Sequence, residues 1–454
     1  MTFSGQCFDY TVQFEQLDFG HFNLHVNTAN RRSATCYDNV FFGNTEIQHV
    51  EGFYFEGDHT LQFTVPGNGR IDLEYGGLKI WHFCGGWGQT AMSVFHTLEA
   101  FVGGLSDHPK EPVIGSHTPP YMEKANVDFI EASLGYRLEE RPIYQVDLDE
   151  SEIHSGDFIL ILRLDGLDPM IMYGTGSRGA HCTMALWFDD GLYIVESQDA
   201  WYWPTAGIQR TPYQQWIKQA SDASFNVVLL PLNADAQAKF DEQKARDWFF
   251  ETEGLPYGYH NFLFGWQDTP RDNLPPAMSN QLVPVVLQLV YDLIPGAVYN
   301  LFIEGLNKRL DNPGCMDLPC IATIAAGLNM DIQDVIAIPE QDGWIYTGLP
   351  NDGQAFVCSA YSASVWKAAG LFDDMEINAT EFTPIDVYRM AFFDANYTRP
   401  QACIDADPTL PYCQLIGKYR IDVQDDWNWM QPYDHMYEHC AGITPLYTPT
   451  PTGC

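Results

Sequence analysis

The sequence predicts an α+β fold with more than one domain. Apolar and polar side chains alternate in short runs over residues 2–104, which is typical of strands separated by turns. A strongly apolar run at Phe158–Leu164 and a hairpin over Gly179–Gln198 continue the strand pattern in the middle of the chain. A helical run then begins at Cys358 and stops at Gly370. At 454 residues the chain is long enough for a large core.

Composition divides the chain into four segments. Residues 1–105 form a β-rich accessory domain for which we expect a β-sandwich, and residues 106–121, with four prolines, form a linker. Residues 122–395 form the main α+β domain. Residues 396–454 are rich in Pro, Asp, Trp and Cys, which indicates an irregular tail stapled by disulfides.

The charge of the chain excludes several classes of partner. Sixty acidic residues against 23 basic residues give a net charge of -37, so nucleic acid and anionic membrane surfaces are not expected partners. The most apolar stretch, Leu282–Ile303, contains Pro284, Asp292 and Pro295 and predicts buried helices rather than a membrane span. The acidic run Asp147–Glu150 lacks a glycine-containing calcium loop, so we expect a solvated surface there and no metal site.

Cysteine usage points to an oxidising compartment. There are 11 cysteines, and six of them lie close in sequence as the pairs Cys315 with Cys320, Cys403 with Cys413, and Cys440 with Cys454. If Cys358 is unpaired, ten remain, which is enough for five disulfides. Glycosylation sequons begin at Asn378 and Asn396, which fits a secreted or lumenal protein. The chain does not open with a leader pattern, so we expect that a signal peptide was removed or left out.

Cys358 is the first candidate for chemistry. Small and long side chains follow it without Pro or Gly as far as Gly370, so it lies in the first turn of the predicted helix. The unpaired N–H groups and the positive dipole end of a helix lower a thiol pKa and populate the thiolate. A disulfide half or a buried inert thiol is the alternative for any single cysteine.

The hairpin supplies a candidate base. Asp190-Gly191 between two β-prone runs predicts a two-residue turn, which places Glu196 opposite Ala185 and therefore on the sheet face of His181. The two are not directly opposite in this register, so contact needs twist or a bulge. Gln198 lies on the same face and is the reserve partner for His181. A strand histidine with a polar neighbour and a separate activated cysteine predicts nucleophilic catalysis.

Four motifs follow one another in a particular order: a Gly-Asp pair before a hydrophobic strand, a strand histidine followed by Asp-Gly and Val-Glu, a Gly-x-Pro-Tyr turn, and a late Cys-Ser helix. They are Gly156-Asp157; His181 with Asp190-Gly191 and Val195-Glu196; Gly254, Pro256 and Tyr257; and Cys358-Ser359. In this order, histidine before cysteine, they resemble the circularly permuted papain-like amidases (YaeF/YiiX-like), which belong with the NlpC-type cell-wall peptidases and the lecithin-retinol acyltransferases. The resemblance covers about residues 150–375.

The resemblance implies a permuted papain-like domain over residues 122–395. It implies Cys358 as nucleophile and His181 as base, oriented by Glu196 or Gln198, with Tyr257 lining the site. Backbone N–H groups at Cys358 and Ser359 are expected to stabilise an oxyanion, at about 3 kcal/mol per donor. Two positions depart from the family pattern: Gly258 replaces an acidic residue, and Cys182 replaces a small or aliphatic one.

The expected activity is cysteine-dependent hydrolysis of amide or ester bonds in a peptide, lipid or glycan-linked substrate. The covalent chemistry predicts no cofactor. Acyl transfer by the same residues is one alternative. The other is a secreted glycan-binding or structural protein on a papain-like scaffold, for which Trp81, Trp87 and Tyr75 supply candidate aromatics. The sequence does not give the oligomeric state.

Overall fold

The structure, a computed structural model, describes residues 1–436 except 6, 19, 35, 44–47, 65–77, 84–119, 135–136, 165–166, 199–206, 265–301, 331, 337 and 348–351. It combines helices with antiparallel sheets, so the predicted mixed α and β content is confirmed. The chain divides into two compact units, and the described residues up to Phe83 belong to the first. Each unit is described by itself.

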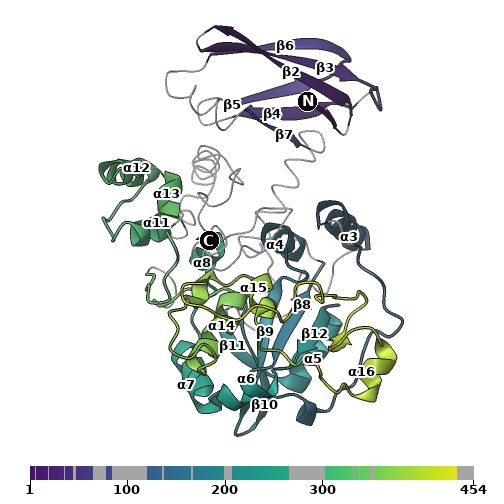
Figure 1. Ribbon diagram of the computed structural model, residues 1–454, viewed down its shortest axis with the longest axis vertical. Coiled ribbons are helices and arrows are strands. Elements are labelled where there is room, and N and C mark those ends of the chain that lie inside the picture. Colours follow the sequence, from purple (N-terminus) through teal and green to yellow (C-terminus); the bar gives the residue numbers. More distant parts are fainter. Residues whose placement is uncertain are drawn as a thin grey trace. The chain divides into compact units, whose positions relative to one another are not determined.

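The first unit consists of two antiparallel sheets (Figure 1). The larger has the order β1-β2-β3-β6 and the smaller β5-β4-β7. The strands are β1 (Thr2–Ser4), β2 (Asp9–Asp18), β3 (His21–Ala29), β4 (Asp38–Gly43), β5 (Gln48–Phe53), β6 (Gly57–Thr64) and β7 (Lys79–Phe83).

One apolar core joins the two sheets of this unit. Phe22 and Leu24 of β3 pack in the same buried cluster as Phe42 of β4 and Phe53 of β5. The alternation of apolar and polar residues therefore predicts the buried face correctly. Tyr75 and Trp87 of the expected glycan surface lie outside the described residues, as does the side chain of Trp81.

The second unit is built on a six-stranded antiparallel sheet with the order β11-β10-β9-β8-β12-β13. Its strands are β8 (Phe158–Leu162), β9 (His181–Phe188), β10 (Gly191–Gln198), β11 (Gly207–Pro212), β12 (Asn226–Leu230) and β13 (Cys413–Ile416). The segment treated as a tail in the sequence thus contributes an edge strand to the central sheet.

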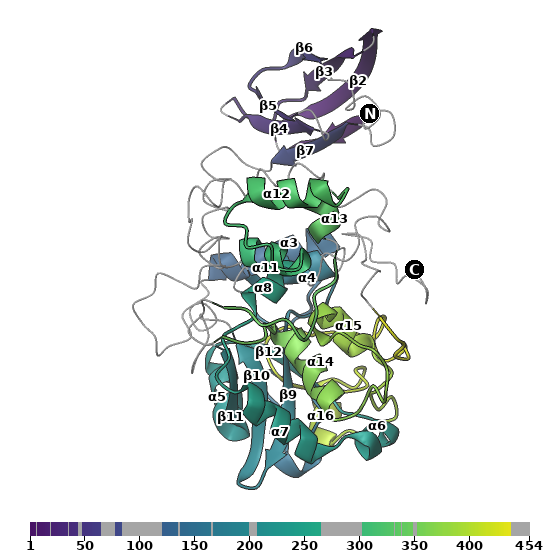
Figure 2. The same cartoon turned by 90° about the vertical axis from the view of Figure 1, so that its left-hand side faces the viewer.

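Helices cover both faces of this sheet (Figures 1 and 2). On one face, α14 (Cys358–Ala368) and α7 (Glu242–Thr252) pack against the even-numbered side chains of β8 and β9. On the other face, α5 (Tyr213–Asp222) and α16 (Gln401–Ala406) pack against the odd-numbered side chains. The two faces of β9 therefore contact different helices.

The described residues contain further helices of 3 to 15 residues. They are α3 (Pro120–Leu134), η1 (Glu150–Glu152), α4 (Leu167–Thr175), α6 (Ala234–Lys239), α8 (Tyr259–Phe264), α11 (Glu304–Arg309), α12 (Leu318–Gly327), α13 (Ile332–Ile336), η3 (Ala379–Glu381) and α15 (Pro384–Arg389). The helical composition of residues 234–253 corresponds to two helices, because the Asp241 carboxylate accepts a hydrogen bond from the Lys244 N–H and starts a new helix there. The acidic run ends similarly: Asp149 accepts from Ser151 N–H and caps η1.

The Gly-Asp motif before β8 ties the sheet to the cysteine helix. Asp157 is fully buried and accepts hydrogen bonds from the N–H groups of His154 and Leu232, both at 2.8 Å. The carbonyl of Gly156 accepts a hydrogen bond from the indole of Trp366 on α14 at 3.0 Å. This motif therefore has a structural explanation in the described residues.

Three disulfides lie within the described residues: Cys7–Cys36, Cys315–Cys320 and Cys403–Cys413. Two of them are the predicted neighbours in sequence, while Cys440 and Cys454 lie outside the described residues. Cys182 and Cys358 are both free and buried, so the ten cysteines other than Cys358 do not all pair, and fewer than five disulfides form. Cys182 lies instead in the apolar cluster between β9 and α14, which also contains Cys358. Three disulfides are compatible with a secreted or lumenal protein.

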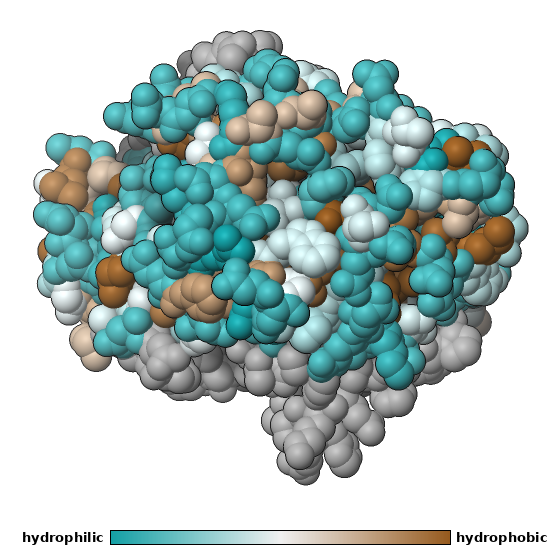
Figure 3. All heavy atoms as spheres, turned by 90° about the horizontal axis from the view of Figure 1, so that it is seen from below, coloured by the Kyte–Doolittle hydropathy of each residue, from teal (hydrophilic) through white to brown (hydrophobic). Residues whose placement is uncertain are grey.

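Several predictions concern segments at the limits of the described residues. The linker at 106–121 and the apolar stretch 282–303 lie outside them, except that α3 begins at Pro120 and Phe302 and Ile303 precede α11. Among the helices that the structure does describe, none has the length and apolarity to cross a membrane. The face of the molecule seen in Figure 3 is mainly hydrophilic, with hydrophobic residues in small patches. Of the two sequon asparagines, Asn396 is exposed, whereas Asn378 is half-buried.

Candidate active site

The candidate nucleophile lies at the first residue of α14, as predicted from the sequence. Val357 occupies the N-cap position in an extended conformation, and its side chain has no atom that can accept a hydrogen bond from the first turn. Gly370, with φ of 89°, lies two residues beyond the end of the helix and takes the left-handed conformation that glycine favours. The backbone N–H groups of the first turn thus remain available beside Cys358.

Three hydrogen bonds hold the chain segment that leads into this helix. The Phe356 carbonyl accepts from the Gly258 N–H at 3.0 Å and from the Ser197 hydroxyl at 2.8 Å. The Val357 N–H donates to the side-chain oxygen of Asn261 at 3.0 Å. The position of Cys358 is therefore set from β10 and from the Gly-x-Pro-Tyr turn and α8, which lie far from it in sequence.

Gly258, one of the two departures from the family pattern, has a steric explanation. A Cβ atom at this residue would lie 2.4 Å from the backbone nitrogen and carbonyl carbon of Phe356. Only glycine allows the two backbones to approach this closely. The acidic residue found in the family pattern would displace the segment before Cys358.

The candidate base is bonded to the predicted carboxylate. His181 Nε2 lies 2.7 Å from Glu196 Oε2, and the other carboxylate oxygen accepts a hydrogen bond from the indole of Trp216 at 3.1 Å. All three side chains are buried. Because Nε2 faces Glu196, Nδ1 is the ring nitrogen that remains for Cys358.

The hairpin reaches this arrangement through a different turn. Gly191 pairs with Phe188, and the two-residue turn is Asp189-Asp190 rather than Asp190-Gly191. A type I′ turn needs positive φ at both central residues, whereas the positive φ of 141° falls on Gly191 after the turn. Ala185 therefore pairs with Ile194, so the predicted register is wrong by two residues, which leaves every side chain on its predicted face.

The backbone pairing of β9 with β10 ends at Met184 opposite Val195. Beyond that pair, β9 continues to pair with β8 and β10 with β11. The Glu196 side chain bridges the last part of the two strands to reach His181.

The sulfur of Cys358 is surrounded by groups from β9 and the residue before it. The thiol lies 3.5 Å from the Ala180 carbonyl oxygen, to which it donates. The sulfur is also hydrogen-bonded to the side chain of His181 and to both the thiol and the backbone N–H of Cys182. These contacts bring together Cys358 and His181, which the sequence predicts as nucleophile and base, and Cys182, which the sequence shows only as an unusual residue after the histidine.

The electrostatics favour an ion pair. The hydrogen bond from the Cys182 thiol and those from His181 and the Cys182 backbone hold the pKa of Cys358 well below its usual value, although burial opposes this. Burial lowers the pKa of His181, but its hydrogen bonds to Cys358 and Glu196 outweigh burial and raise the pKa to about 9. Between these two pKa values the pair is a thiolate beside an imidazolium.

The other predicted site residues, Ser359, Tyr257 and Gln198, are all buried. Ser359 is buried in the first turn of α14, and Tyr257 is buried beside Tyr259, with ring centroids 5.0 Å apart. Gln198 is buried, and its Oε1 has no hydrogen-bond partner among the described residues. Glu196, not Gln198, is the residue bonded to His181.

Ser197, Asn261 and Trp216 also contact the site, although no sequence motif marks them. Their contacts to the site connect residues that are 20 to 159 positions apart in the chain. The only signal for Asn261 is its position three residues after Gly258 in an aromatic turn, which has no distinctive chemistry.

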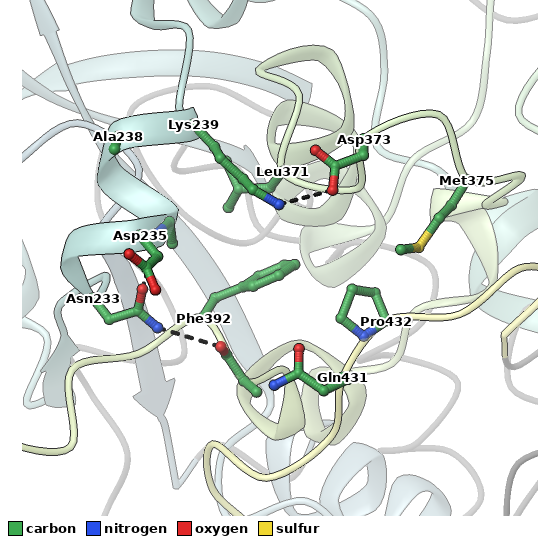
Figure 4. A pocket seen from close by; sticks show the side chains of 12 residues that line it. Asn233, Asp235, Ala238, Lys239, Leu371, Asp373, Met375, Phe392, Gln431 and Pro432 are labelled. Carbon is green, nitrogen blue, oxygen red and sulfur yellow. Dashed lines mark hydrogen bonds and ion pairs between the residues drawn. The ribbon is translucent and has the colours of Figure 1, made fainter.

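A separate pocket of about 540 Å³ lies between α6 and the segments after α14 and α15 (Figure 4). Its lining combines the ion pair of Lys239 and Asp373, 2.8 Å apart, with apolar side chains such as Met375 and Phe392. It contains none of the candidate site residues. Among the described residues, no three His, Cys, Asp or Glu side chains are grouped as metal ligands.

No protein-family model matches the chain, and no curated protein sequence matches it. One solved structure to which the chain is similar is the metalloprotein YiiX from Escherichia coli O157:H7, with 21% identity and a TM-score of 0.19. The aligned part covers 25% of this chain and 57% of that one. A similarity at this level does not establish a shared fold.

Proposed function

We propose that the protein is a secreted cysteine-dependent hydrolase of amide or ester bonds, and that residues 122–395, completed by α16 and the edge strand β13, form a circularly permuted papain-like domain. One observation carries this proposal: Cys358 at the start of α14, His181 and Glu196 form a continuous buried set of hydrogen bonds. The order of the chain, with the histidine strand before the cysteine helix, supports the permuted arrangement.

In the first step the thiolate of Cys358 attacks the acyl carbon of the substrate. The tetrahedral oxyanion accepts hydrogen bonds from the N–H groups of Cys358 and Ser359 in the first turn of α14. As the carbon–nitrogen or carbon–oxygen bond breaks, His181 gives its Nδ1 proton to the leaving amine or alcohol. A thioester on Cys358 remains.

In the second step water attacks the thioester. His181, now neutral, accepts the proton of this water, and the acid product leaves as the sulfur recovers its charge. Glu196 keeps the ring in the orientation and tautomer that direct Nδ1 toward the sulfur. Trp216 fixes Glu196 in turn.

The test measures the reactivity of Cys358 and its turnover separately. Iodoacetamide is applied near neutral pH, and the label is mapped by mass spectrometry; a p-nitrophenyl ester and acyl-aminocoumarin amides serve as substrates. Selective alkylation of Cys358, an acyl adduct on the same residue and loss of both in Cys358→Ala are expected. His181→Ala is expected to lower both rates by about 10²-fold or more.

His435→Ala is the matched control, because His435 is an exposed histidine of the same unit and pairs with Glu376 at 2.9 Å. It is expected to behave like the wild type. Finding Cys358 in a disulfide, or finding that its alkylation rate is the same in His181→Ala and the wild type, overturns the proposal.

A further inference from the structure

Cys182 is a buried nucleophilic group that the proposed mechanism does not use. It and Cys358 are the free cysteines of the described part of the chain. Cys182 directly follows His181 on β9, with its side chain on the opposite face of the strand from His181. That face packs against α14, and both cysteines belong to the same apolar cluster.

The contacts between the two cysteines are directional. Both the thiol and the backbone N–H of Cys182 are hydrogen-bonded to the sulfur of Cys358. Together with the Ala180 carbonyl at 3.5 Å and the His181 ring, they place three consecutive residues around this sulfur. A thiolate at this position has donors on two sides, the imidazolium and the thiol.

We propose that Cys182 is a positioning residue for the nucleophile, whose S–H group donates to the Cys358 sulfur and stabilises it as a thiolate. Its importance for catalysis rests on the proposed function, but the contact itself does not. The backbone N–H of Cys182 orients the same sulfur, so the strand supplies two donors from one residue.

The environment determines which of the two sulfurs carries the proton. Burial and the hydrogen bond to Cys358 raise the pKa of Cys182 well above its usual value, and the carboxylates of Asp168 on α4 and Asp386 on α15 act in the same direction. Cys358 has the imidazolium of His181 beside it, whereas the charged groups that act on Cys182 are anionic. Cys182 therefore stays a neutral donor while Cys358 is charged.

Other charged groups act on this pair through His181. Glu196 raises the pKa of His181 by its hydrogen bond, and the guanidinium of Arg163 opposes this rise. Arg163 is itself paired with Asp168 at 2.9 Å in the buried interior. Because these groups are the same in every variant below, a difference between variants reports the side chain at position 182.

The test is the pH dependence of alkylation of Cys358. Iodoacetamide labelling is followed from pH 4 to 10, and only the peptide that contains Cys358 is quantified. Cys182→Ala is expected to raise the pH at the midpoint of the Cys358 labelling curve by about one unit. At a pH below the midpoints of both proteins, the variant then has about tenfold less thiolate and is labelled more slowly. Cys182→Ser keeps an O–H donor and is expected to lie between Cys182→Ala and the wild type.

Met184→Leu is the matched control, since Met184 lies two residues along the same face of β9 in the same cluster and changes packing without removing a donor. It is expected to leave the midpoint unchanged. A folded Cys182→Ala protein with the wild-type midpoint overturns the proposal, as does a Cys182–Cys358 disulfide in the native protein.

Because labelling needs no substrate, the two proposals fail separately. A wild type that hydrolyses none of the substrates, but whose midpoint shifts in Cys182→Ala, contradicts the hydrolase and supports the contact between thiols. A wild type that hydrolyses the substrates, but whose midpoint of Cys358 labelling equals that of Cys182→Ala, supports the hydrolase and contradicts the contact between thiols.

Discussion

Replacing Glu196 by glutamine changes one oxygen of the site to an NH2 group and is predicted to invert the tautomer of His181. Trp216 decides the orientation of the new amide. Its indole N–H can only donate, and it now donates to Glu196 at 3.1 Å, so the amide oxygen of glutamine has to face the indole. The NH2 group then faces His181 Nε2, which becomes an acceptor. The ring proton moves to Nδ1, the nitrogen that should accept the proton of Cys358.

The expected change in the pKa of His181 follows from the hydrogen bond to Glu196 that the substitution weakens. The bond between His181 and Glu196 measures 2.7 Å and both side chains are at most 2% exposed, so solvent screens it little. A hydrogen bond to a charged group contributes about 1.5–3 kcal/mol, and about 1.4 kcal/mol is one pKa unit. The pKa of His181 is therefore expected to fall by about one to two units from its value of about 9. The thiolate–imidazolium pair then loses population at neutral pH.

The assay is the alkylation rate of Cys358 between pH 5 and 10. Glu196→Gln is expected to label more slowly at pH 7, by about tenfold or more, and Glu123→Gln, an acid-to-amide change on α3 in the same unit, is expected to label like the wild type. Adding Trp216→Phe to Glu196→Gln frees the amide to turn its oxygen toward His181 and should restore part of the rate. A folded Glu196→Gln protein with the wild-type pH profile refutes the reasoning.

Two further predictions concern the backbone and the leaving group. Gly258→Ala is expected to lower the free energy of unfolding by about 1–3 kcal/mol and to slow alkylation of Cys358, because the added Cβ would meet backbone atoms at 2.4 Å. Gly327→Ala is the control, since nothing lies within 4 Å of its Cβ position. In denaturant titrations it should be neutral or slightly stabilising. Hydrolysis of the amide substrates is expected to decline above about pH 9, since the pKa of His181 is about 9 and only the imidazolium can protonate an amine leaving group. A hydrolysis rate that stays level to about pH 10.5 contradicts this prediction.

The face on which His181 and Glu196 meet could be predicted although the turn could not. A two-residue turn starting at Asp189 instead of Asp190 shifts each partner by two positions, and the alternation of side chains has a period of two. The error in the turn therefore leaves Glu196 on the predicted sheet face and changes only which residue pairs with Ala185. A shift of one residue would have placed Glu196 on the α14 side of the sheet.

The contacts that complete the site could not be predicted for a different reason. Ser197 and Asn261 act on the segment before Cys358 across 159 and 96 residues, and nothing in their local sequence differs from that of ordinary polar residues. β13 is only four residues long, too short for a periodic pattern, and it lies in a region whose composition indicates irregular structure. Such features become visible only when the strands are arranged in the sheet.

The alternation of strand residues also explains how neighbouring residues contact one sulfur. His181 and Cys182 point to opposite faces of β9, and Glu196 with Trp216 of α5 occupies the first face while α14 packs on the second. His181 is the first residue of the strand, where its ring can reach past the strand end to the start of α14. The base is therefore fixed from one layer of the fold and the thiol donor from the other, so a substitution in α5 and one at Cys182 should alter the reactivity of Cys358 through separate contacts.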